Sequence, residues 1–159
     1  MTDLSLRPAS PGDLDACIAL LEAVRLRLRT YQPRFWNPAP GSSAMSRAWF
    51  GHLLSQAEVV FLVAEQAGGL AGFLIAQPQP APPVYDPDGP TALVDDFWVD
   101  APERWVDAGA ALLAEARARM RERGVAQVVV VCPDREPEKK AMLAAAGLSI
   151  ASTWWTAEA

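Results

Sequence analysis

Two adjacent acids, Asp95 and Asp96, are the residues of this chain best suited to proton transfer. They lie in the segment VDDFWVDAPERWVDAG, residues 94–109, at the centre of a run typical of a strand. Neighbouring side chains of a strand point to opposite faces, so one carboxylate can face a cleft while the other faces away. A carboxylate in a cleft could remove a proton from an ammonium group as a general base. The alternative is that the acids pair with nearby arginines or lie at a strand edge.

The same segment continues into a turn with the layout of an anion site. A strand-like run ends at Val99, a short loop follows, and a helix pattern opens after Gly109. The free N–H groups and the positive dipole end of a helix N-terminus attract anions. Asp107 lies inside this turn, and its carboxylate would repel an anion. The turn is therefore an anion site, a damaged one, or no site at all.

Composition narrows the class of protein. The chain has 159 residues, 51% of them hydrophobic, with a net charge of −5. We therefore expect one domain over residues 1–159, with no affinity for nucleic acid or for an anionic membrane. No apolar run approaches the roughly 18 residues of a membrane span, and the N-terminus has no signal-peptide pattern, so we expect a cytoplasmic protein. No Cys or His cluster has metal-ligand spacing, so no metal is expected.

The elements that would position these residues follow from periodicity. Strand and helix patterns alternate in the order βααβββαβαβ, which predicts an α/β (α+β) fold with a mixed, mostly antiparallel sheet flanked by helices. A Gly68–Gly69 turn predicts a hairpin within residues 58–79. Residues 126–133 have no central polar break and predict a strand buried on both faces. Residues 149–158 predict a last strand, with Trp154 or Trp155 in the core and the other exposed or at a dimer contact.

This order, with the turn after the fourth strand, resembles the GCN5-related N-acetyltransferase (GNAT) superfamily. Members transfer an acyl group from acyl-coenzyme A to an amine. The family shows a strand with acids and aromatics, Val, and then Arg/Gln-x-x-Gly-x-Gly/Ala before a helix. Val99, Arg104, Asp107 and Gly109 stand at these steps without a gap. DDFWV is also similar to polyamine and diamine acetyltransferases, so a turn without a site is the least favoured interpretation.

The resemblance implies a set of site residues and partners. Acetyl-CoA would be the co-substrate, and the acceptor would be an amine of a small molecule or a peptide. Asp95 would be the base, or Asp96 if the pleat is reversed. Dimers formed through the last strands are common in the family, so the resemblance allows a homodimer. The residues expected to bind acetyl-CoA are Phe97, Trp98 and Val99 along the pantetheine arm, and Arg104, Asp107, Ala108, Gly109 and Ala110 at the pyrophosphate.

The chain departs from the family pattern at four positions. Asp107 replaces the first glycine, and Trp105 could obstruct the pocket mouth. Glu136 and Leu143 stand where the family often has Asn and Tyr, and that Tyr commonly protonates the departing thiolate. The sequence thus predicts an N-acetyltransferase, with a catalytically impaired GNAT-like binding or interaction domain as the alternative. The general acid stays open among water and the following residues: Tyr31, His52, Tyr85 and Cys132.

Overall fold

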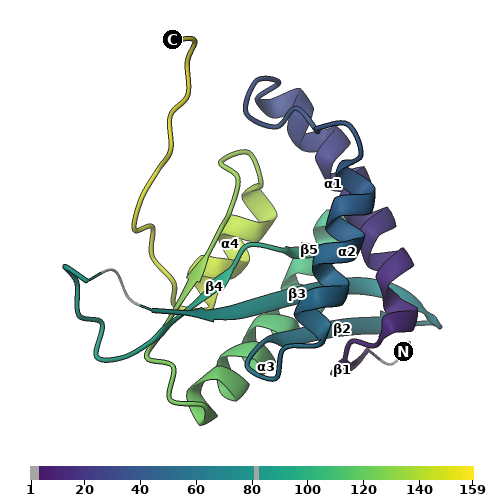
Figure 1. The fold of residues 1–159 in the computed structure, drawn as a ribbon. Helices are drawn as coiled ribbons and strands as arrows, with labels where there is room; N and C mark the ends of the chain where they lie inside the picture. Colours follow the sequence, from purple (N-terminus) through teal and green to yellow (C-terminus); the bar gives the residue numbers. More distant parts are fainter. Residues whose placement is uncertain (1–3, 81–82) are drawn as a thin grey trace.

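The computed structural model describes residues 4–80 and 83–159 (Figure 1). A central sheet has α1 and α2 on one face and α3 on the other, with α4 beside α3. The strands are β1 (Ser5–Pro8), β2 (Val60–Gln66), β3 (Gly69–Gln79), β4 (Thr91–Val94), β5 (Phe97–Val99) and β6 (Gln127–Val130). The helices are α1 (Leu14–Tyr31), α2 (Ser42–Leu54), α3 (Ala108–Glu122) and α4 (Pro137–Ala145), with 3-10 turns η1 (Pro11–Asp13) and η2 (Pro102–Val106).

The sheet is mixed and mostly antiparallel, as the sequence predicted. Its strand order is β1-β2-β3-β4-β6, and β5 pairs with β3. Among the strands of the described residues, β4 and β6 form a parallel pair and the other pairs are antiparallel. The predicted fold class, a mixed α+β fold with helices flanking the sheet, is confirmed.

Helix α1 begins where local capping chemistry allows it. Ser10 and Asp13 form a reciprocal capping box around Pro11, and Arg7 binds the Asp13 carboxylate. This hydrogen-bonded pair holds the pKa of Asp13 well below its usual range. The helix then buries residues spaced three or four apart, which are Leu14, Cys17, Ile18, Leu21, Val24 and Leu28.

The β2–β3 hairpin is confirmed, but its turn lies one residue earlier than predicted. Ala67 and Gly68 have positive φ values of 51° and 78°, and Gly69 already belongs to β3. Two consecutive residues with positive φ fit a type I′ turn, whose twist matches that of the flanking strands. The pattern located a hairpin correctly, but it placed the second glycine in the turn when Ala67 occupies that position.

The strand-like run that ends at Val99 is interrupted at its two acids. Leu93 pairs with Gln77 and Phe97 pairs with Leu74. Three residues on this strand, Val94–Asp96, therefore lie opposite two on β3, which is a β-bulge. A bulge bends a strand and increases its twist. As a result β4 pairs with β6, whereas β5 continues along β3 alone.

Two predictions about the C-terminal part of the chain are wrong. The first placed residues 126–133 in a strand buried on both faces. In the described chain β6 pairs with β4 alone, so it is an edge strand, and its residues alternate between exposed and half-buried. Residues 149–158 form no strand, and Trp154 and Trp155 are 82% and 93% exposed, so neither is in the core. Strand formation needs cross-strand pairing, and this segment pairs with no strand in the described chain. The observed order therefore ends at α4 (Figure 1).

Candidate functional site

The candidate site begins where β5 and β6 diverge. Val131 donates its backbone N–H to Val94 O at 2.9 Å, directly beyond the parallel β4–β6 ladder. Beyond this point β5 stays with β3, while the chain after β6 turns toward α4. Side chains from η2 and α4 fill the space beside β5. The bulge, the outer edge of β5 and the start of α3 are therefore brought into one region.

The two acids of the bulge have different environments. Asp95 is exposed and Asp96 is half-buried. Burial raises the pKa of Asp96 to about 6, and the neighbouring Asp95 charge adds to this; Arg25 and Lys139 act in the opposite direction. A carboxylate with this pKa is mostly ionised at pH 7 and remains a competent base. Burial and the raised pKa make Asp96 the better candidate base, whereas the sequence analysis placed Asp95 first.

The outer edge of β5 carries backbone groups that do not face β3. Ile75 N–H donates to Asp96 O at 2.8 Å, and Asp100 N–H donates to Ala71 O at 3.0 Å. Backbone groups alternate in direction along a strand, so those of Phe97 and Val99 face away from β3. An extended ligand could pair with this edge as an added strand would.

A buried lysine on α4, Lys139, contacts this edge and was missed by the sequence analysis. Its side chain is 0% exposed, and Nζ donates to Phe97 O at 2.9 Å. Burial lowers the pKa of Lys139 to about 8. Its position three and four residues before the buried Met142 and Leu143 places it on the inner face of α4, and that spacing could have identified it.

Trp105 lies inside this region and does not stand at a pocket mouth. It is 2% exposed, and its ring meets the Phe97 ring edge to face at a centroid distance of 4.9 Å. It also covers Gly109, where an added Cβ would lie 2.6 Å from Trp105 Cε3. Gly109 is therefore required by the packing of this tryptophan as well as by any ligand that approaches α3.

At the start of α3, Asp107 binds groups that an anion would otherwise meet. Its carboxylate accepts hydrogen bonds from the N–H of Ala108 and from Arg104 Nε. Arg104 also donates to Gln66 on β2, and within the described residues its buried Nη2 has no hydrogen-bond partner. Asp107 is thus the N-cap of α3 and partly neutralises the positive charge of this turn.

The two departures at the N-cap and within α4 have structural roles. Glu136 is buried and accepts hydrogen bonds from Arg27 at 3.0 and 3.2 Å, which ties α4 to α1. Leu143 is buried in the core, so no hydroxyl stands at the position of the family tyrosine.

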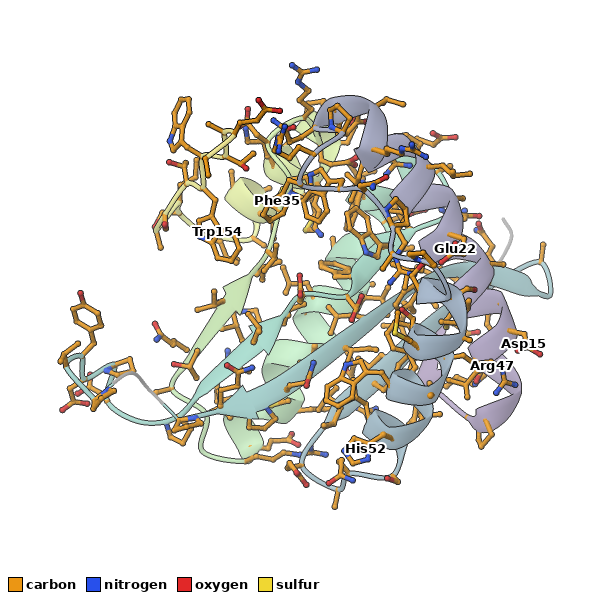
Figure 2. All side chains as sticks on the ribbon, turned by 45° about the horizontal axis from the view of Figure 1, so that its top comes forward. Asp15, Glu22, Phe35, Arg47, His52 and Trp154 are labelled. Atoms are coloured by element: carbon orange, nitrogen blue, oxygen red, sulfur yellow. The ribbon has the colours of Figure 1, made fainter. Side chains whose placement is uncertain are left out.

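Among the described residues, Cys132 is the one of the four candidate acids that interacts electrostatically with Lys139. Burial raises the pKa of the Cys132 thiol. Tyr85 is exposed in the loop before β4, and Tyr31 ends α1. His52 stacks on Trp49 on the exposed side of α2, near its end (Figure 2). None of the side chains of Tyr31, His52 and Tyr85 is recorded in contact with the bulge acids.

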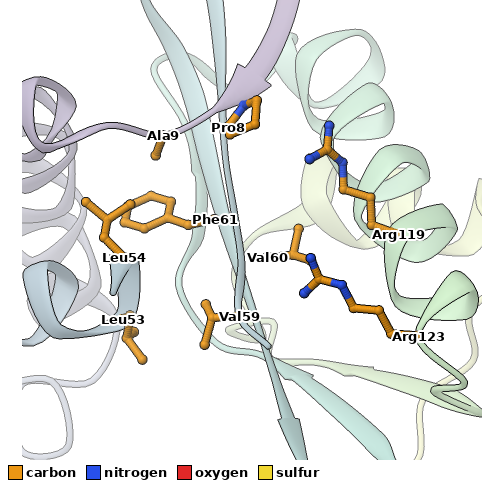
Figure 3. Close-up of a pocket in the computed structure, with 9 residues that line it drawn as sticks. All are labelled: Pro8, Ala9, Leu53, Leu54, Val59, Val60, Phe61, Arg119 and Arg123. Atoms are coloured by element: carbon orange, nitrogen blue, oxygen red, sulfur yellow. The ribbon is translucent and has the colours of Figure 1, made fainter. Parts of the chain in front are cut away.

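A cavity of about 270 Å³ lies elsewhere, at the beginning of β2 (Figure 3). Its lining residues stand on both sides of β2, with Leu53, Leu54 and Phe61 on one side and Arg119 and Arg123 on the other. None of its lining residues belongs to the candidate site. Within residues 4–80 and 83–159, no three His, Cys, Asp or Glu side chains converge as a metal site, and no helix is long and apolar enough to cross a membrane.

Comparisons with known proteins identify the family and the fold of this chain. Residues 21–144 match the model of the acetyltransferase (GNAT) family, so the chain belongs to that family. Its fold is similar to that of a predicted acetyltransferase from Clostridium acetobutylicum, solved with acetyl-CoA, at 14% identity, a TM-score of 0.72, and coverage of 98% of this chain and 96% of that one. No curated protein matches.

Two further solved structures share the fold. A GCN5-related N-acetyltransferase from Ralstonia eutropha is 20% identical, with a TM-score of 0.75 and coverage of 98% and 99%. An aminoglycoside antibiotic 6′-N-acetyltransferase from Acinetobacter baumannii is 14% identical, with a TM-score of 0.73 and coverage of 99% and 98%. The family and these neighbours support acetyl transfer in general and the use of an acyl-CoA.

Proposed function

We propose that this protein transfers an acetyl group from acetyl-CoA to an amine of a small molecule or of a protein. The observation that carries the proposal is the half-buried carboxylate of Asp96, held in a β-bulge beside the outer edge of β5 with a raised pKa. An amine attacks an acyl carbon only as the neutral base, so a carboxylate near the acyl group must take its proton. Asp96 is that base, and Asp95 is the exposed acid that draws the cationic acceptor toward it.

The acetyl-CoA site fits the residues present, with one opposing charge. Because Phe97 O already accepts a hydrogen bond from Lys139, the outward N–H of Phe97 and the outward groups of Val99 would bind the pantetheine arm, with Trp98 packed behind them. Arg104, Ala108, Gly109 and Ala110 would bind the pyrophosphate at the start of α3. The Nη2 atom of Arg104 supports this assignment, because among the described residues it is buried without a hydrogen-bond partner, although Nε and Nη1 of the same guanidinium bind Asp107 and Gln66. Asp107 opposes it, so its carboxylate must turn toward solvent when the anion binds.

A second candidate is a GNAT domain that binds or interacts without catalysis. The observation that favours it is Asp107, whose carboxylate already occupies the Ala108 N–H and Arg104 Nε that a pyrophosphate would use. Leu143 favours it as well, since it supplies no proton to the leaving group.

Calorimetric titration with acetyl-CoA, followed by an amine screen, separates the two candidates. For the enzyme we expect binding in the micromolar range, a rise in melting temperature with ligand concentration, and thiol release that requires an amine. Binding without thiol release from any amine, including polyamines and aminoglycosides, would favour the second candidate. No binding at millimolar acetyl-CoA would overturn the proposal.

Three further assignments belong to the same proposal. Residues 1–159 form a single GNAT-like domain, and the protein acts in the cytoplasm. A homodimer would use the exposed C-terminal segment, where Trp154 and Trp155 present apolar surface and the edge of β6 beyond β4 is unpaired in the described chain. Light scattering of the wild type and of Trp155→Ser measures the oligomeric state.

A further inference from the structure

Lys139 is the side chain of this molecule whose burial most needs an explanation. Lysine is almost never fully buried unless its charge is compensated. Here the ammonium has one recorded hydrogen bond, to a backbone carbonyl, and it lies 4.2 Å from the centroid of the Trp98 ring and 5.1 Å from that of Trp105. Cation–π contacts offset part of the lost hydration. An apolar residue would fill the same space at lower cost, which suggests that the position needs an ammonium group.

The charged groups around Lys139 come from three sides. Asp95 and Asp96 at the bulge, Cys132 in the segment after β6, and Glu136 at the N-cap of α4 are the titratable groups that interact electrostatically with it. Asp96 is also near Arg25, and Glu136 is bound by Arg27. Asp96 and Glu136 thus each interact with an arginine. Among the described residues, the Lys139 ammonium makes no hydrogen bond to a carboxylate, and it donates to Phe97 O at the edge of β5.

Lys139 also lies where a residue could donate a proton to the acyl site. Residues 139 and 143 lie one turn apart on the same face of α4. Leu143 occupies the place of the missing tyrosine, and Lys139 brings an acidic N–H to the carbonyl that follows Asp96 in the strand. The candidate base at the bulge and this donor at the outer edge of β5 are close enough to interact electrostatically.

We propose that Lys139 is the general acid of the acyl transfer and protonates the departing thiolate. This inference rests on the proposed function. Asp96 first takes a proton from the acceptor ammonium and passes it to water. The neutral nitrogen then forms a bond to the acyl carbon, the carbon–sulfur bond breaks, and its electron pair stays on sulfur. Asp96 takes the second proton from this nitrogen, while Lys139 gives a proton from Nζ to the sulfur and becomes a neutral amine. Water then returns a proton to Lys139 and removes the one held by Asp96.

The environment suits this step. A lysine with a pKa of about 8 is mainly protonated at pH 7, and an alkyl thiol has a pKa of about 8.5. The transfer is then nearly thermoneutral, which is the condition in which acid catalysis is most effective. After the transfer the buried side chain is neutral, and a neutral amine is less costly to bury than an ammonium.

The test compares Lys139→Met with Lys140→Met, a matched lysine on the same helix whose ammonium binds the exposed Asp134. For Lys139→Met we expect kcat to fall about 100-fold, with KM for acetyl-CoA within about threefold of wild type. The decline of wild-type kcat above pH 8 should disappear in this variant. Lys140→Met should behave as wild type in all three measurements.

A binding measurement gives a readout that does not depend on turnover. Wild type should bind CoA at least about fivefold more tightly than desulfo-CoA, and Lys139→Met should lose this preference because the ammonium no longer meets the sulfur. Two results would mean that Lys139 only fills the space. One is an unchanged kcat in Lys139→Met, and the other is that this variant binds CoA and desulfo-CoA more tightly than wild type by the same factor. If Lys139→Met does not fold, the same measurements are made on Lys139→Gln. The ratio of the wild-type dissociation constants for desulfo-CoA and CoA then shows whether the ammonium meets the sulfur. An inactive wild type that binds neither ligand would overturn the proposed function itself.

Discussion

The two ends of the candidate site are built differently. At the start of α3 the important contacts are local: Asp107 binds Ala108 beside it and Arg104 three residues before it. At the bulge, burial and Asp95 raise the pKa of Asp96, and Arg25 from α1 and Lys139 from α4 lower it. The first end is therefore readable from a short motif, and the second is assembled from residues far apart in the sequence.

This difference also separates binding from catalysis. In the proposed function the α3 end determines how strongly an anion is held, and the half-exposed carboxylate of Asp107 opposes that binding. The bulge end transfers protons through the half-buried Asp96 and the fully buried Lys139. Substitutions at the bulge should therefore change rates and pH dependence, whereas those at α3 should change affinity or helix packing.

The largest effect is expected for Asp96→Asn. Loss of the base should lower kcat/KM by about 10²–10⁴, while Asp95→Asn should cost less than about tenfold. In wild type, activity should rise with pH through about 6, because Asp96 must lose its proton to act as a base. Acceptor-dependent thiol release across pH 5–9 measures both effects. A larger loss in Asp95→Asn than in Asp96→Asn would reverse the assignment.

A second expectation concerns the stability contributed by Lys139. Its folded pKa of about 8 lies below the unfolded value of 10.5, so between these values the unfolded chain binds more protons and stability rises with pH. Wild type should thus gain roughly 2–3 kcal/mol relative to Lys139→Met between pH 7 and 10. Urea unfolding at several pH values measures this gain. A constant difference between the two proteins would show that the lysine is hydrated in solution.

Gly109→Ala tests the packing at the α3 end. The added Cβ would meet Trp105 Cε3 at 2.6 Å, and we expect a loss of about 1–3 kcal/mol in the free energy of unfolding. Gly51→Ala is the matched control, since that helical Cβ would meet its nearest atom at 3.9 Å. The control should gain up to about 1 kcal/mol from helix propensity. Equal effects of the two substitutions in thermal or urea unfolding would contradict the contact.

The smallest effect is expected for Asp107→Asn. The amide oxygen can still cap α3, but the negative charge is removed, so acetyl-CoA should bind about tenfold more tightly, equivalent to about 1.4 kcal/mol. The gain should decrease at high salt because the carboxylate is half exposed. Glu103→Gln, a nearby exposed acid, should change the dissociation constant much less. Weaker binding in Asp107→Asn would show that the carboxylate helps to hold the ligand.

The segment from the bulge to α3 was the most predictable part of the molecule. Its strand, turn and helix follow from local patterns, and the adjacent acids marked the bulge region. The sequence did not reveal the bulge itself, because an extra residue in a strand appears only when its pairing with β3 is known. The bulge decides that Asp96 is half-buried and Asp95 is exposed.

The C-terminal region was predicted least well for the same physical reason. The residues around Trp154 have the composition of a strand, but a strand exists only with a partner, and the described chain supplies none. Instead, this segment lies beside the loop after α1, where the rings of Phe35 and Trp154 are 6.2 Å apart (Figure 2). Arg34 also forms an ion pair with Glu158.

By itself the sequence determined the mixed sheet, the helices that flank it and the motif that leads into α3, because capping, periodicity and turn chemistry act over a few residues. The tertiary structure alone decided which acid is half-buried, and it placed an unanticipated ammonium, that of Lys139, against Phe97 O. Burial and charge neighbours set a pKa, and both arise from residues that meet only when the chain is folded.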